Sequence, residues 1–423
     1  MRTRIRILLT AFGLLLGPAH SISQPVWVSR QSLPTPRTGA CAVEFEGKIY
    51  VIGGRGSQGQ ILKVVERYDP VNDRWEVNVP PLKRPLENAA AVVFNGTIYV
   101  LGGRDNKGEV KNEVVSWNRQ RNRWEEQKEM KEEREGLTAV VLDGRLYAIG
   151  GLGEDDDQET FLRSVEYLEE DKEEWKISED WRLDFARASF ATVVVRDSAF
   201  SLGGFSTGGP LDVVQRYHPA AGTQQKAVMP TPRGGLAAVA REDTIFVFGG
   251  RSPADQVLNT VEFYLPEENR WHRAQALSLP REGFAAVAVD GVIYLFGGRD
   301  EDGNVLDSVE AARARDVVTS VPPAPSAQPE DFALEQNYPN PFNPETRIEF
   351  SVPAGNRDLV RLRVYNLLGE VVRTLLQGPL ASGRYAVTWD GRDDLGRLAA
   401  SGVYLYTLEI GSRRISRRMT LLR

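Results

Sequence analysis

Short apolar runs that end on two adjacent glycines recur six times along the chain. The first reads GKIYVIGG at residues 47–54, and the glycine pairs stand at 53–54, 102–103, 150–151, 203–204, 249–250 and 297–298. Within each unit, apolar residues alternate with polar ones or run for four to six positions between turn signals, as strands do. Dipeptides such as Glu46-Gly47 and Asn95-Gly96 fit the first hairpin turn of a unit. Helical periodicity is absent, so the pattern predicts an all-β protein.

Tryptophan marks a second repeated position. It stands 21 to 24 residues after the second glycine in four units, as Trp75, Trp124, Trp175 and Trp271. Gln225 takes this position in the fourth unit, and the sixth unit has Thr319 there, at the start of a proline-rich stretch. Trp27 precedes Gly53 by 26 residues, the spacing that Trp124 and Trp271 have to the following pair. We therefore expect the strand at about 25–30 to complete the sixth unit and close the repeat into a ring.

A period near fifty residues with a glycine pair in every unit closely resembles the kelch repeat, over residues 25–318. The resemblance implies a six-bladed kelch β-propeller closed by the N-terminal strand, with four strands in each blade. The glycine pair ends the second strand, where the backbone bends and crowds against its neighbours. We expect the propeller to occupy residues 24–318.

Arginine fills nine of twelve equivalent positions in these units. Five arginines stand sixteen residues before the first glycine of a pair: Arg37, Arg134, Arg187, Arg233 and Arg281, with Leu86 in the second unit. Four follow a pair directly: Arg55, Arg104, Arg251 and Arg299, with Leu152 and Phe205 in the other two units. In the kelch family both positions lie towards one mouth of the channel. The resemblance therefore implies an arginine-rich rim, and these nine residues are the predicted ligand-binding set.

The charge balance favours an acidic ligand at this rim. The chain has a formal net charge of −6, and most of the acidic excess falls in the repeats. An acidic body with a cationic mouth focuses anions towards the channel, and guanidinium groups suit carboxylates and phosphates. We predict recognition of an acidic glycan or an acidic protein loop. In the structural alternative the arginines brace neighbouring blades, with the recurring Glu66, Glu166, Glu262 and Glu310 as partners.

Other functions have less support. Only His218 and His272 follow the N-terminal leader, and no set of residues has the spacing of metal ligands, so neither a metal nor a cofactor is predicted. No catalytic residue stands out, and the balance is against an enzyme. The alternative is a carbohydrate-active enzyme of the sialic-acid mutarotase or lyase type, as some kelch proteins are. A purely structural or adhesive surface protein is a third reading, while the acidic repeats argue against nucleic acid.

The N-terminus indicates export. Arg2, Arg4 and Arg6 precede an apolar run at 7–17 that is too short to span a bilayer, and small residues stand before Gln24. Residues 1–23 are therefore a predicted signal peptide, and no later run approaches the length of a transmembrane segment. Cys41 is the single cysteine, which excludes an intramolecular disulfide.

After a proline-rich linker at 319–331, residues 332–423 show a different pattern. Apolar residues alternate as in half-buried strands, at Ile348/Phe350/Val352, Leu362/Val364 and Tyr385/Val387/Trp389, with glycines between them. This predicts a small immunoglobulin-like β-sandwich. The prolines of NYPNPFNP at 337–344 donate no ladder hydrogen bonds, so this stretch should lie along a sheet edge or cross a sheet end.

Several sequence motifs of this segment together resemble the C-terminal sorting domain of the type IX secretion system, which is related to flagellar-hook-capping immunoglobulin-like modules. They are NYPNPFNP, VYNLLGEVV, WDGRDDLG, ASGVYLY and RMTLLR. The resemblance implies that the type IX machinery is a partner and carries the protein from the periplasm to the surface or exterior of a Gram-negative bacterium. The alternative is an accessory adhesive sandwich that the mature protein keeps.

Overall fold

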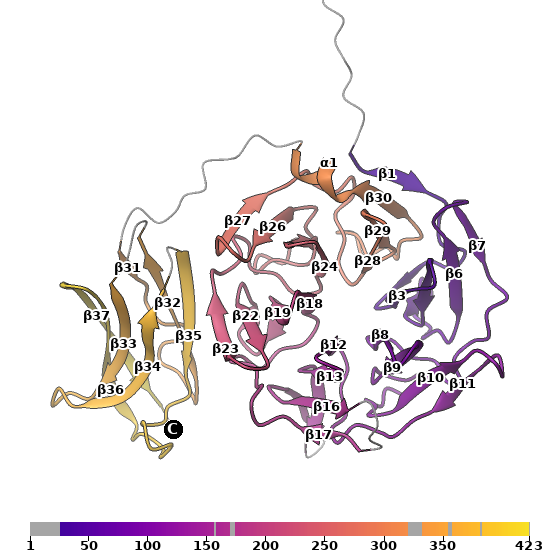
Figure 1. Ribbon diagram of the computed structural model, residues 1–423. Coiled ribbons are helices and arrows are strands. Elements are labelled where there is room, and N and C mark those ends of the chain that lie inside the picture. Colours follow the sequence, from indigo (N-terminus) through magenta and orange to yellow (C-terminus); the bar gives the residue numbers. More distant parts are fainter. Residues whose placement is uncertain are drawn as a thin grey trace, which may run out of the picture.

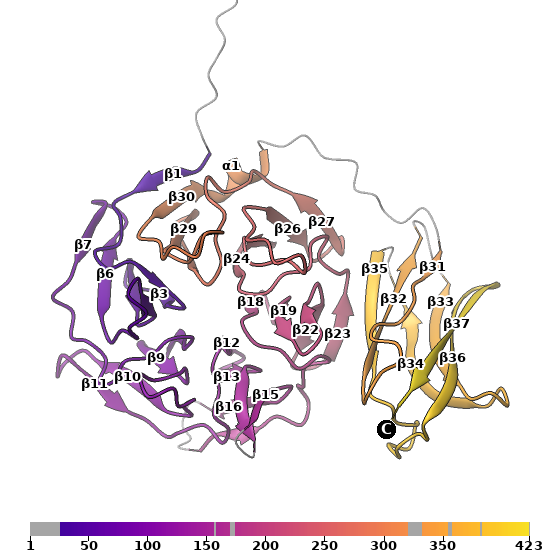
Figure 2. The same ribbon diagram turned by 180° about the vertical axis from the view of Figure 1, so that it is seen from behind.

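The computed structural model describes residues 26–155, 158–169, 174–319, 332–353, 358–380 and 383–422. These residues form a ring of six four-stranded antiparallel sheets and a β-sandwich beside the ring (Figures 1 and 2). The predicted signal peptide and the linker beyond Thr319 lie outside the described residues. The prediction of an all-β propeller followed by an immunoglobulin-like sandwich is confirmed.

Hairpins form because each apolar run is bounded by residues that tolerate a left-handed backbone. Glu46, Gly47, Asn95 and Gly96 have φ angles between 49° and 73°, as tight hairpin turns require. The first, innermost strands of the blades are β3 (Cys41–Phe45), β8 (Ala90–Phe94), β12 (Thr138–Leu142), β18 (Ala191–Val195), β24 (Ala237–Arg241) and β28 (Ala285–Val289). Neighbouring innermost strands contact one another around the channel.

The other strands of each blade follow outwards. The second strands are β4 (Lys48–Ile52), β9 (Thr97–Leu101), β13 (Arg145–Ile149), β19 (Ser198–Leu202), β25 (Thr244–Phe248) and β29 (Val292–Phe296). The third strands are β6 (Val65–Asp69), β10 (Val114–Asn118), β16 (Val165–Glu169), β22 (Val214–His218), β26 (Val261–Leu265) and β30 (Val309–Arg313). The outer strands are β7 (Arg74–Glu76), β11 (Arg123–Glu126), β17 (Lys176–Ile177), β23 (Gly222–Lys226), β27 (Arg270–Arg273) and β1 (Val28–Arg30).

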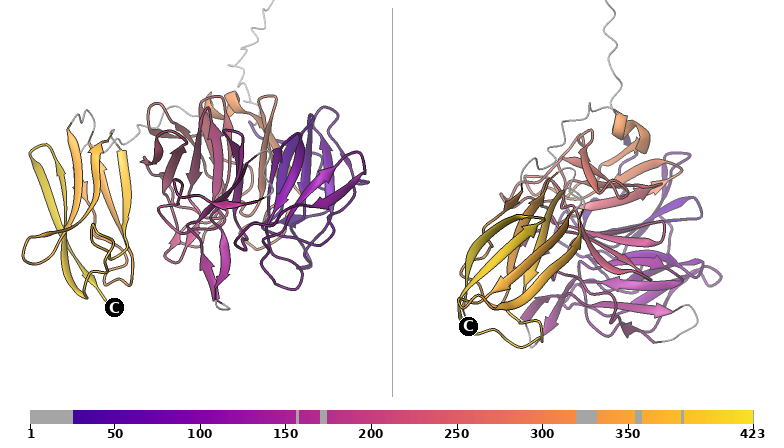
Figure 3. Two further views of the ribbon diagram at one scale, coloured as in Figure 1. Left: turned by 60° about the horizontal axis from the view of Figure 1, so that its bottom comes forward. Right: turned by 60° about the vertical axis from the view of Figure 1, so that its left-hand side comes forward.

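Short strand pairs decorate the connections that follow the glycine pairs. They are β2 (Arg37–Thr38) with β5 (Arg55–Gly56), β14 (Leu152–Asp155) with β15 (Gln158–Phe161), and β20 (Phe205–Ser206) with β21 (Gly209–Pro210). The β14–β15 hairpin contains the acidic insertion of the third unit and projects from the ring (Figure 3). Residues 314–319 form α1 (Ala314–Thr319), a six-residue helix that follows the last strand of the repeats. Val317 of α1 is fully buried beside Trp27, which gives this short helix a packing role.

The N-terminal strand closes the ring as predicted. β1 pairs antiparallel with β30, in the register Val28↔Ala311 to Arg30↔Val309. Trp27 is 4% exposed, and its ring meets Phe248 edge-on with centroids 5.8 Å apart. Blade six therefore combines strands from both ends of the repeat region.

A tryptophan in or beside the outer strand links most blades to the preceding one. Its Nε1 donates a hydrogen bond of 2.8–3.1 Å to a carbonyl in the connection from that blade: Trp27 to Gln275, Trp75 to Gln31, Trp124 to Pro80, Trp175 to Lys128 and Trp271 to Ala227. These bonds form a belt around the ring. The repeated tryptophans are thus packing residues that also join blades.

Blade four replaces both roles of its missing tryptophan. Gln225 donates its side-chain amide to Asp184 Oδ2 at 2.9 Å, in the connection from blade three. Trp181 supplies the aromatic ring, stacked on Tyr217 with centroids 4.3 Å apart and planes at 6°. Trp181 lies outside the repeat positions, so the repeat pattern gave no reason to assign it this role.

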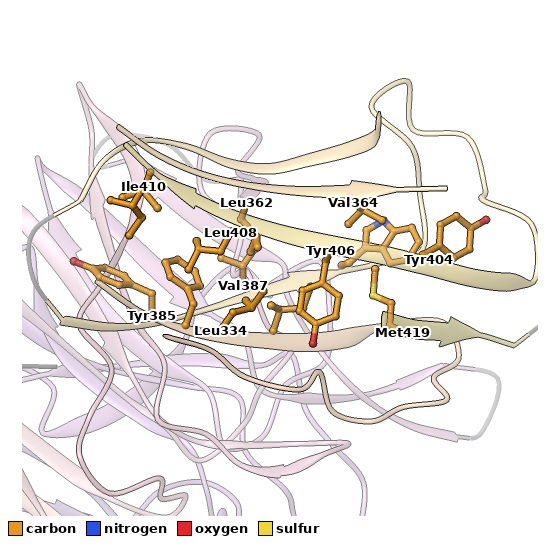
Figure 4. Close-up of a cluster of buried hydrophobic side chains, with 14 of the residues drawn as sticks. Leu334, Leu362, Val364, Tyr385, Val387, Tyr404, Tyr406, Leu408, Ile410 and Met419 are labelled. Carbon is orange, nitrogen blue, oxygen red and sulfur yellow. The ribbon is translucent and has the colours of Figure 1, made fainter. Parts of the chain in front are cut away.

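The C-terminal segment folds into two packed sheets. One has the order β31 (Ala333–Leu334), β32 (Thr346–Val352) and β35 (Gly383–Trp389). The other has the order β34 (Val371–Pro379), β33 (Leu359–Tyr365), β36 (Gly402–Ile410) and β37 (Arg413–Leu421). The alternating residues named from the sequence are at most 8% exposed and face one another in the core (Figure 4).

The NYPNPFNP stretch runs along the edges of both sheets, as predicted. Tyr338 bridges to Arg347 of β32, and Phe342 bridges in parallel to Leu421 of β37. Asn337 is 2% exposed, and its side-chain amide donates to Thr346 Oγ1 at 2.9 Å. The proline-rich stretch thereby ties the two sheets together at one end.

Removing the closing tryptophan should weaken the whole ring. We expect Trp27→Ala to lower the free energy of unfolding by about 3 to 5 kcal/mol, because a large buried ring is lost. Urea unfolding would measure the change. Val28→Ala, at a position that is 47% exposed, should change it by less than about 0.5 kcal/mol. Equal effects of the two substitutions would contradict the closing role of Trp27.

Candidate functional site at the channel mouth

One mouth of the channel is framed by a closed ring of backbone hydrogen bonds. One residue from each blade takes part, and each N–H donates to the carbonyl of its neighbour at 2.7–2.9 Å: Gly39, Asn88, Gly136, Ser189, Gly235 and Gly283. All six residues have φ angles between 50° and 63°. Glycine adopts this backbone freely, and asparagine tolerates it better than most residues. These six positions are therefore occupied by glycine, asparagine or serine, which have small side chains or none.

The residues after the glycine pairs lie beside this ring. Each forms an antiparallel bridge with the residue that precedes a ring residue: Thr38↔Arg55, Glu87↔Arg104, Glu135↔Leu152, Ala188↔Phe205, Gly234↔Arg251 and Glu282↔Arg299. The structure thus places Arg55, Arg104, Arg251 and Arg299 around one mouth. We call these four side chains the arginine rim.

The other five predicted arginines are inside the blades. Arg37 is 1% exposed, and Arg134, Arg187, Arg233 and Arg281 are fully buried. Each donates Nη1 to the carbonyl of the first glycine in its own unit, at 2.8–3.1 Å. These guanidinium groups hold the glycine pairs in place and present no surface to a ligand. The nine-residue set predicted from the sequence is therefore reduced to the arginine rim as the part that a ligand can reach.

Glutamates of the third strands neutralise four of the buried arginines. The pairs are Arg37–Glu66, Arg134–Glu166, Arg233–Glu262 and Arg281–Glu310, at 2.5–3.0 Å. The predicted glutamate partners are thus found for four of the five buried arginines, but each pair lies within one blade and does not brace neighbouring blades. Burial lowers the pKa of Arg233, and the charge of Glu262 opposes that shift.

Blade four departs from this scheme. Gln215 stands where the four blades with a buried Arg–Glu pair have the glutamate, and it accepts from Arg187 Nη2 at 3.4 Å. Burial lowers the pKa of Arg187 to about 10, although Asp184 opposes the shift. Arg187 is therefore the least well neutralised of the buried arginines.

The rim arginines pair with carboxylates that precede ring residues of the next blade. Arg55 binds Glu87 through two nitrogens, Arg104 binds Glu135, and Arg251 binds Glu282 through two nitrogens. Where the rim position is Leu152 or Phe205, the residue that precedes the ring residue of the next blade is Ala188 or Gly234, neither of which has a carboxylate. Arginine at the rim position and glutamate at the facing position thus occur together in these blades. The glutamates directly follow the first arginine position in the sequence, yet they were not among the predicted site residues.

Arg299 breaks the one-to-one pairing. Thr38 occupies the facing position in blade one, and Arg299 instead shares Glu282 with Arg251. Among the described residues, only Nε and Nη2 of Arg299 donate to protein acceptors, both to Glu282. Its side chain is 47% exposed and that of Arg55 is 41% exposed, against 18% for Arg104 and 22% for Arg251. The most exposed guanidinium groups of the rim, those of Arg55 and Arg299, therefore lie at the junction of blades six and one, while Arg104 and Arg251 also bind Glu159 and Asp255.

Glu282 is the shared acceptor of this junction. Burial raises its pKa, but bonds to Arg251 and Arg299 together outweigh burial, so the pKa is lower than its ordinary value of 4.5. The carboxylate is charged at neutral pH and is 7% exposed. It holds two guanidinium groups near one point of the rim.

The opposite face of the propeller contains cavities between blades. A cavity of about 520 Å³ lies between blades one and two, bordered by Tyr50, Trp75 and Trp117. Its charged residues are already paired, Arg67 with Glu76 and Arg119 with Glu46. Two further cavities of about 500 and 440 Å³ lie between blades five and six and between blades four and five. These cavities border the first hairpin turns, at the strand ends remote from the rim.

Within the described ranges, no group of three His, Cys, Asp or Glu side chains is placed to hold a metal ion. His218 Nδ1 accepts from two turn amides, and His272 stacks on Phe263. The helices in the described part of the chain are too short and too polar to cross a membrane.

Buried and rim arginines should differ sharply in their effect on stability. We expect Arg233→Ala to lower the free energy of unfolding by about 3 to 5 kcal/mol, because Glu262 would remain buried without its partner. Arg299→Ala should cost at most about 1 kcal/mol, since the pair is partly exposed. Urea unfolding of both variants would test this, and a large loss for Arg299→Ala would assign that residue to the scaffold.

The stabilising effect of Glu282 should depend on pH. A carboxyl whose pKa is lower in the folded state stabilises the fold above its ordinary pKa, and the effect is lost as pH falls through the folded value. We therefore expect Glu282→Gln to be less stable than the natural protein at about pH 7, with a difference that shrinks below about pH 4.5. Urea unfolding from about pH 7 to 3 would measure this. A difference independent of pH would contradict the charge-based role.

Comparisons with known proteins agree with this architecture. The KLHDC2/KLHL20/DRC7 Kelch-repeats domain matches residues 19–204, and the Kelch motif matches 232–278 and 280–311. The FlgD Ig-like domain matches residues 339–413. Both parts of the chain thus match families with the folds that the structure shows.

Two kelch-repeat proteins are similar to this chain over part of their length. Kelch repeat protein M-T9 of Myxoma virus (strain Lausanne) is 27% identical over 155 residues, which are 34% of this chain and 28% of the viral protein. An F-box/kelch-repeat protein of Arabidopsis thaliana is 42% identical over 60 residues, 14% of this chain and 15% of the plant protein. The matches span less than a third of either relative.

Among solved structures, YjhT is similar with a TM-score of 0.58 and 16% sequence identity. The match covers 66% of this chain and 95% of YjhT. At this identity the similarity shows the propeller fold alone.

Proposed function

We propose that this chain, whose repeats match the KLHDC2/KLHL20/DRC7 Kelch-repeats domain and the Kelch motif, is a binding protein whose site is the arginine rim. The proposed ligand is an acidic glycan or an acidic protein loop. The observation that carries the proposal is the exposed guanidinium group of Arg299 at the junction of blades six and one. There Arg299 binds the carboxylate of Glu282 alone, whereas Arg251 binds both Glu282 and Asp255, and Nη1 of Arg299 has no acceptor among the described residues.

The chemistry of this junction suits a carboxylate, sulfate or phosphate group. Arg299 and Arg55 are the most exposed rim arginines and lie on either side of Thr38, which bridges to Arg55 and donates to the Gly283 carbonyl at 3.1 Å. A guanidinium group that is already oriented by a buried carboxylate loses little conformational entropy when it binds an anion. The rim also offers Leu152 and Phe205 in blades three and four, where the arginines are absent. A ligand with both an anionic group and an apolar part would contact both sectors.

Binding should be led by charge and should require the junction arginines. We expect polygalacturonate, sialyllactose or a glutamate-rich peptide to bind the full chain more tightly at about 20 mM than at about 150 mM NaCl, because salt screens exposed charges. Neutral lactose should bind no better at low salt. The measurement is isothermal titration calorimetry.

The matched variants distinguish the two faces of the propeller. Arg55→Ala with Arg299→Ala should weaken binding of the acidic probes by about tenfold or more, as expected when charged contacts are lost. Arg119→Ala with Arg241→Ala removes the same charge from the opposite face, where the side chains are 71% and 44% exposed. Loss of binding in this control, or no binding of any acidic probe by the natural protein, would overturn the proposal.

We also propose that the protein is exported through the type IX machinery and reaches the surface or exterior of a Gram-negative bacterium. The sequence motifs within residues 337–423 support this export route, and an immunoglobulin-like fold is compatible with a sorting domain. In a strain with a type IX system, the full chain should appear outside the cells. A chain that ends at residue 331 should stay in the periplasm. Equal release of both chains would contradict the sorting role.

A further inference from the structure

The sandwich contacts the wall of blade four through a shared apolar cluster. Ala386 of β35 packs with Phe185, Leu211 and Val213 of the propeller. All four are at most 6% exposed, and Ala386 and Val213 are fully buried. Figures 1 and 2 show β35 beside the outer strand β23. Burial of this degree is typical of a closely packed interface rather than of a transient contact between two domains.

Polar contacts surround the cluster. The Val228 N–H donates to the Arg384 carbonyl at 3.0 Å, which joins the chain after β23 to β35. Asn269 Nδ2 donates to the Tyr385 hydroxyl at 2.9 Å, and Tyr385 is 1% exposed. β23 and β35 are both edge strands of their sheets. The contact therefore covers two edges that would otherwise invite pairing with other chains.

An ion pair completes the interface. Arg347 of β32 binds Asp212 of the propeller, with the two side chains 16% and 9% exposed. The Arg347 guanidinium also lies over the Phe185 ring, 5.8 Å from its centroid. A partly buried pair with a fixed geometry gives an interface its register and specificity. The apolar, backbone and ionic contacts all converge on one blade.

Blade four departs from the repeat at the positions that make these contacts. Phe185 stands two residues before Arg187, where the other units have Thr35, Arg84, Glu132, Thr231 and Leu279. Val213 stands where the other units have Val64, Glu113, Ser164, Thr260 and Ser308. Blade four is the one repeat unit that is apolar at both positions, and the sandwich covers them. The replacement of tryptophan by Gln225 lies in β23 of the same blade.

We propose that blade four is a dedicated docking surface for the chain's own C-terminal sandwich, and that the two domains stay bound after the linker is cut. This docking surface does not include the arginine rim, and the proposal does not depend on how the protein is exported. Cleavage within 320–331 would then yield a two-piece complex rather than a free propeller. Release of the sandwich would need a competing partner or conditions that weaken the interface.

The test uses the full chain with a specific protease site placed in the linker at 322–328. After complete cleavage, verified by denaturing electrophoresis, the two pieces should elute together in size-exclusion chromatography at low micromolar concentration. Elution as two separate species would overturn the proposal. Because the natural interface is intact in this protein, the result does not depend on any substituted variant folding.

Substitutions then assign the complex to this interface. Arg347→Glu should raise the dissociation constant of the cut pieces by about tenfold or more, because Asp212 would face a like charge. Combining it with Asp212→Arg should restore most of the affinity. Asp307→Arg, at the equivalent position of blade six, is the matched control and should change nothing. Co-elution that is insensitive to Arg347→Glu, in a protein with unchanged circular dichroism, would place the contact elsewhere and overturn the assignment.

Discussion

The close approach of neighbouring blades at the glycine pairs sets the rest of the structure. The second glycine of each pair donates its N–H to the carbonyl of the next blade's residue at the first arginine position, at 2.8–2.9 Å, and Gly298 completes the circle on Arg37. A Cβ on Gly203, the first glycine of its pair, would lie 2.6 Å from the Arg233 carbonyl oxygen of the next blade, so a side chain there would push the blades apart. The backbone ring at the mouth stands beside these bonds.

That constraint divides the arginines into two kinds. The second glycine of each pair donates its N–H to the next blade, while the carbonyl of the first glycine points into its own blade. A buried guanidinium group donates a hydrogen bond to that carbonyl, for example from Arg37 or Arg233. The rim arginine follows the same pair but emerges at the mouth, where it meets the carboxylate of the next blade. One set maintains the shape of the mouth, and the other gives the mouth its charge. Binding chemistry at the rim therefore rests on a scaffold made of the same residue type.

The repeat made most of the fold predictable, because spacing between glycines, tryptophans and arginines reports equivalent backbone positions. Ring closure by Trp27 and the alternating strands of the sandwich follow from such spacing. Position alone does not report burial, so the sequence could not separate Arg233 from Arg251. Trp181 and the docked wall of blade four depend on residues outside the repeat pattern. Contacts between distant segments, such as Arg347 with Asp212, have no local signal at all.

Ring closure also has a consequence for the time course of folding. Each hairpin joins residues that are near in sequence, whereas β1 finds its partner only when β30 exists, at the far end of the repeats. Pairing of such distant segments is slow compared with hairpin formation. Until then the blades form an open arc whose two ends present unpaired strand edges and apolar faces. The interval before closure is thus the period in which the chain is most exposed to association with other copies, and the speed with which β1 meets β30 sets its length.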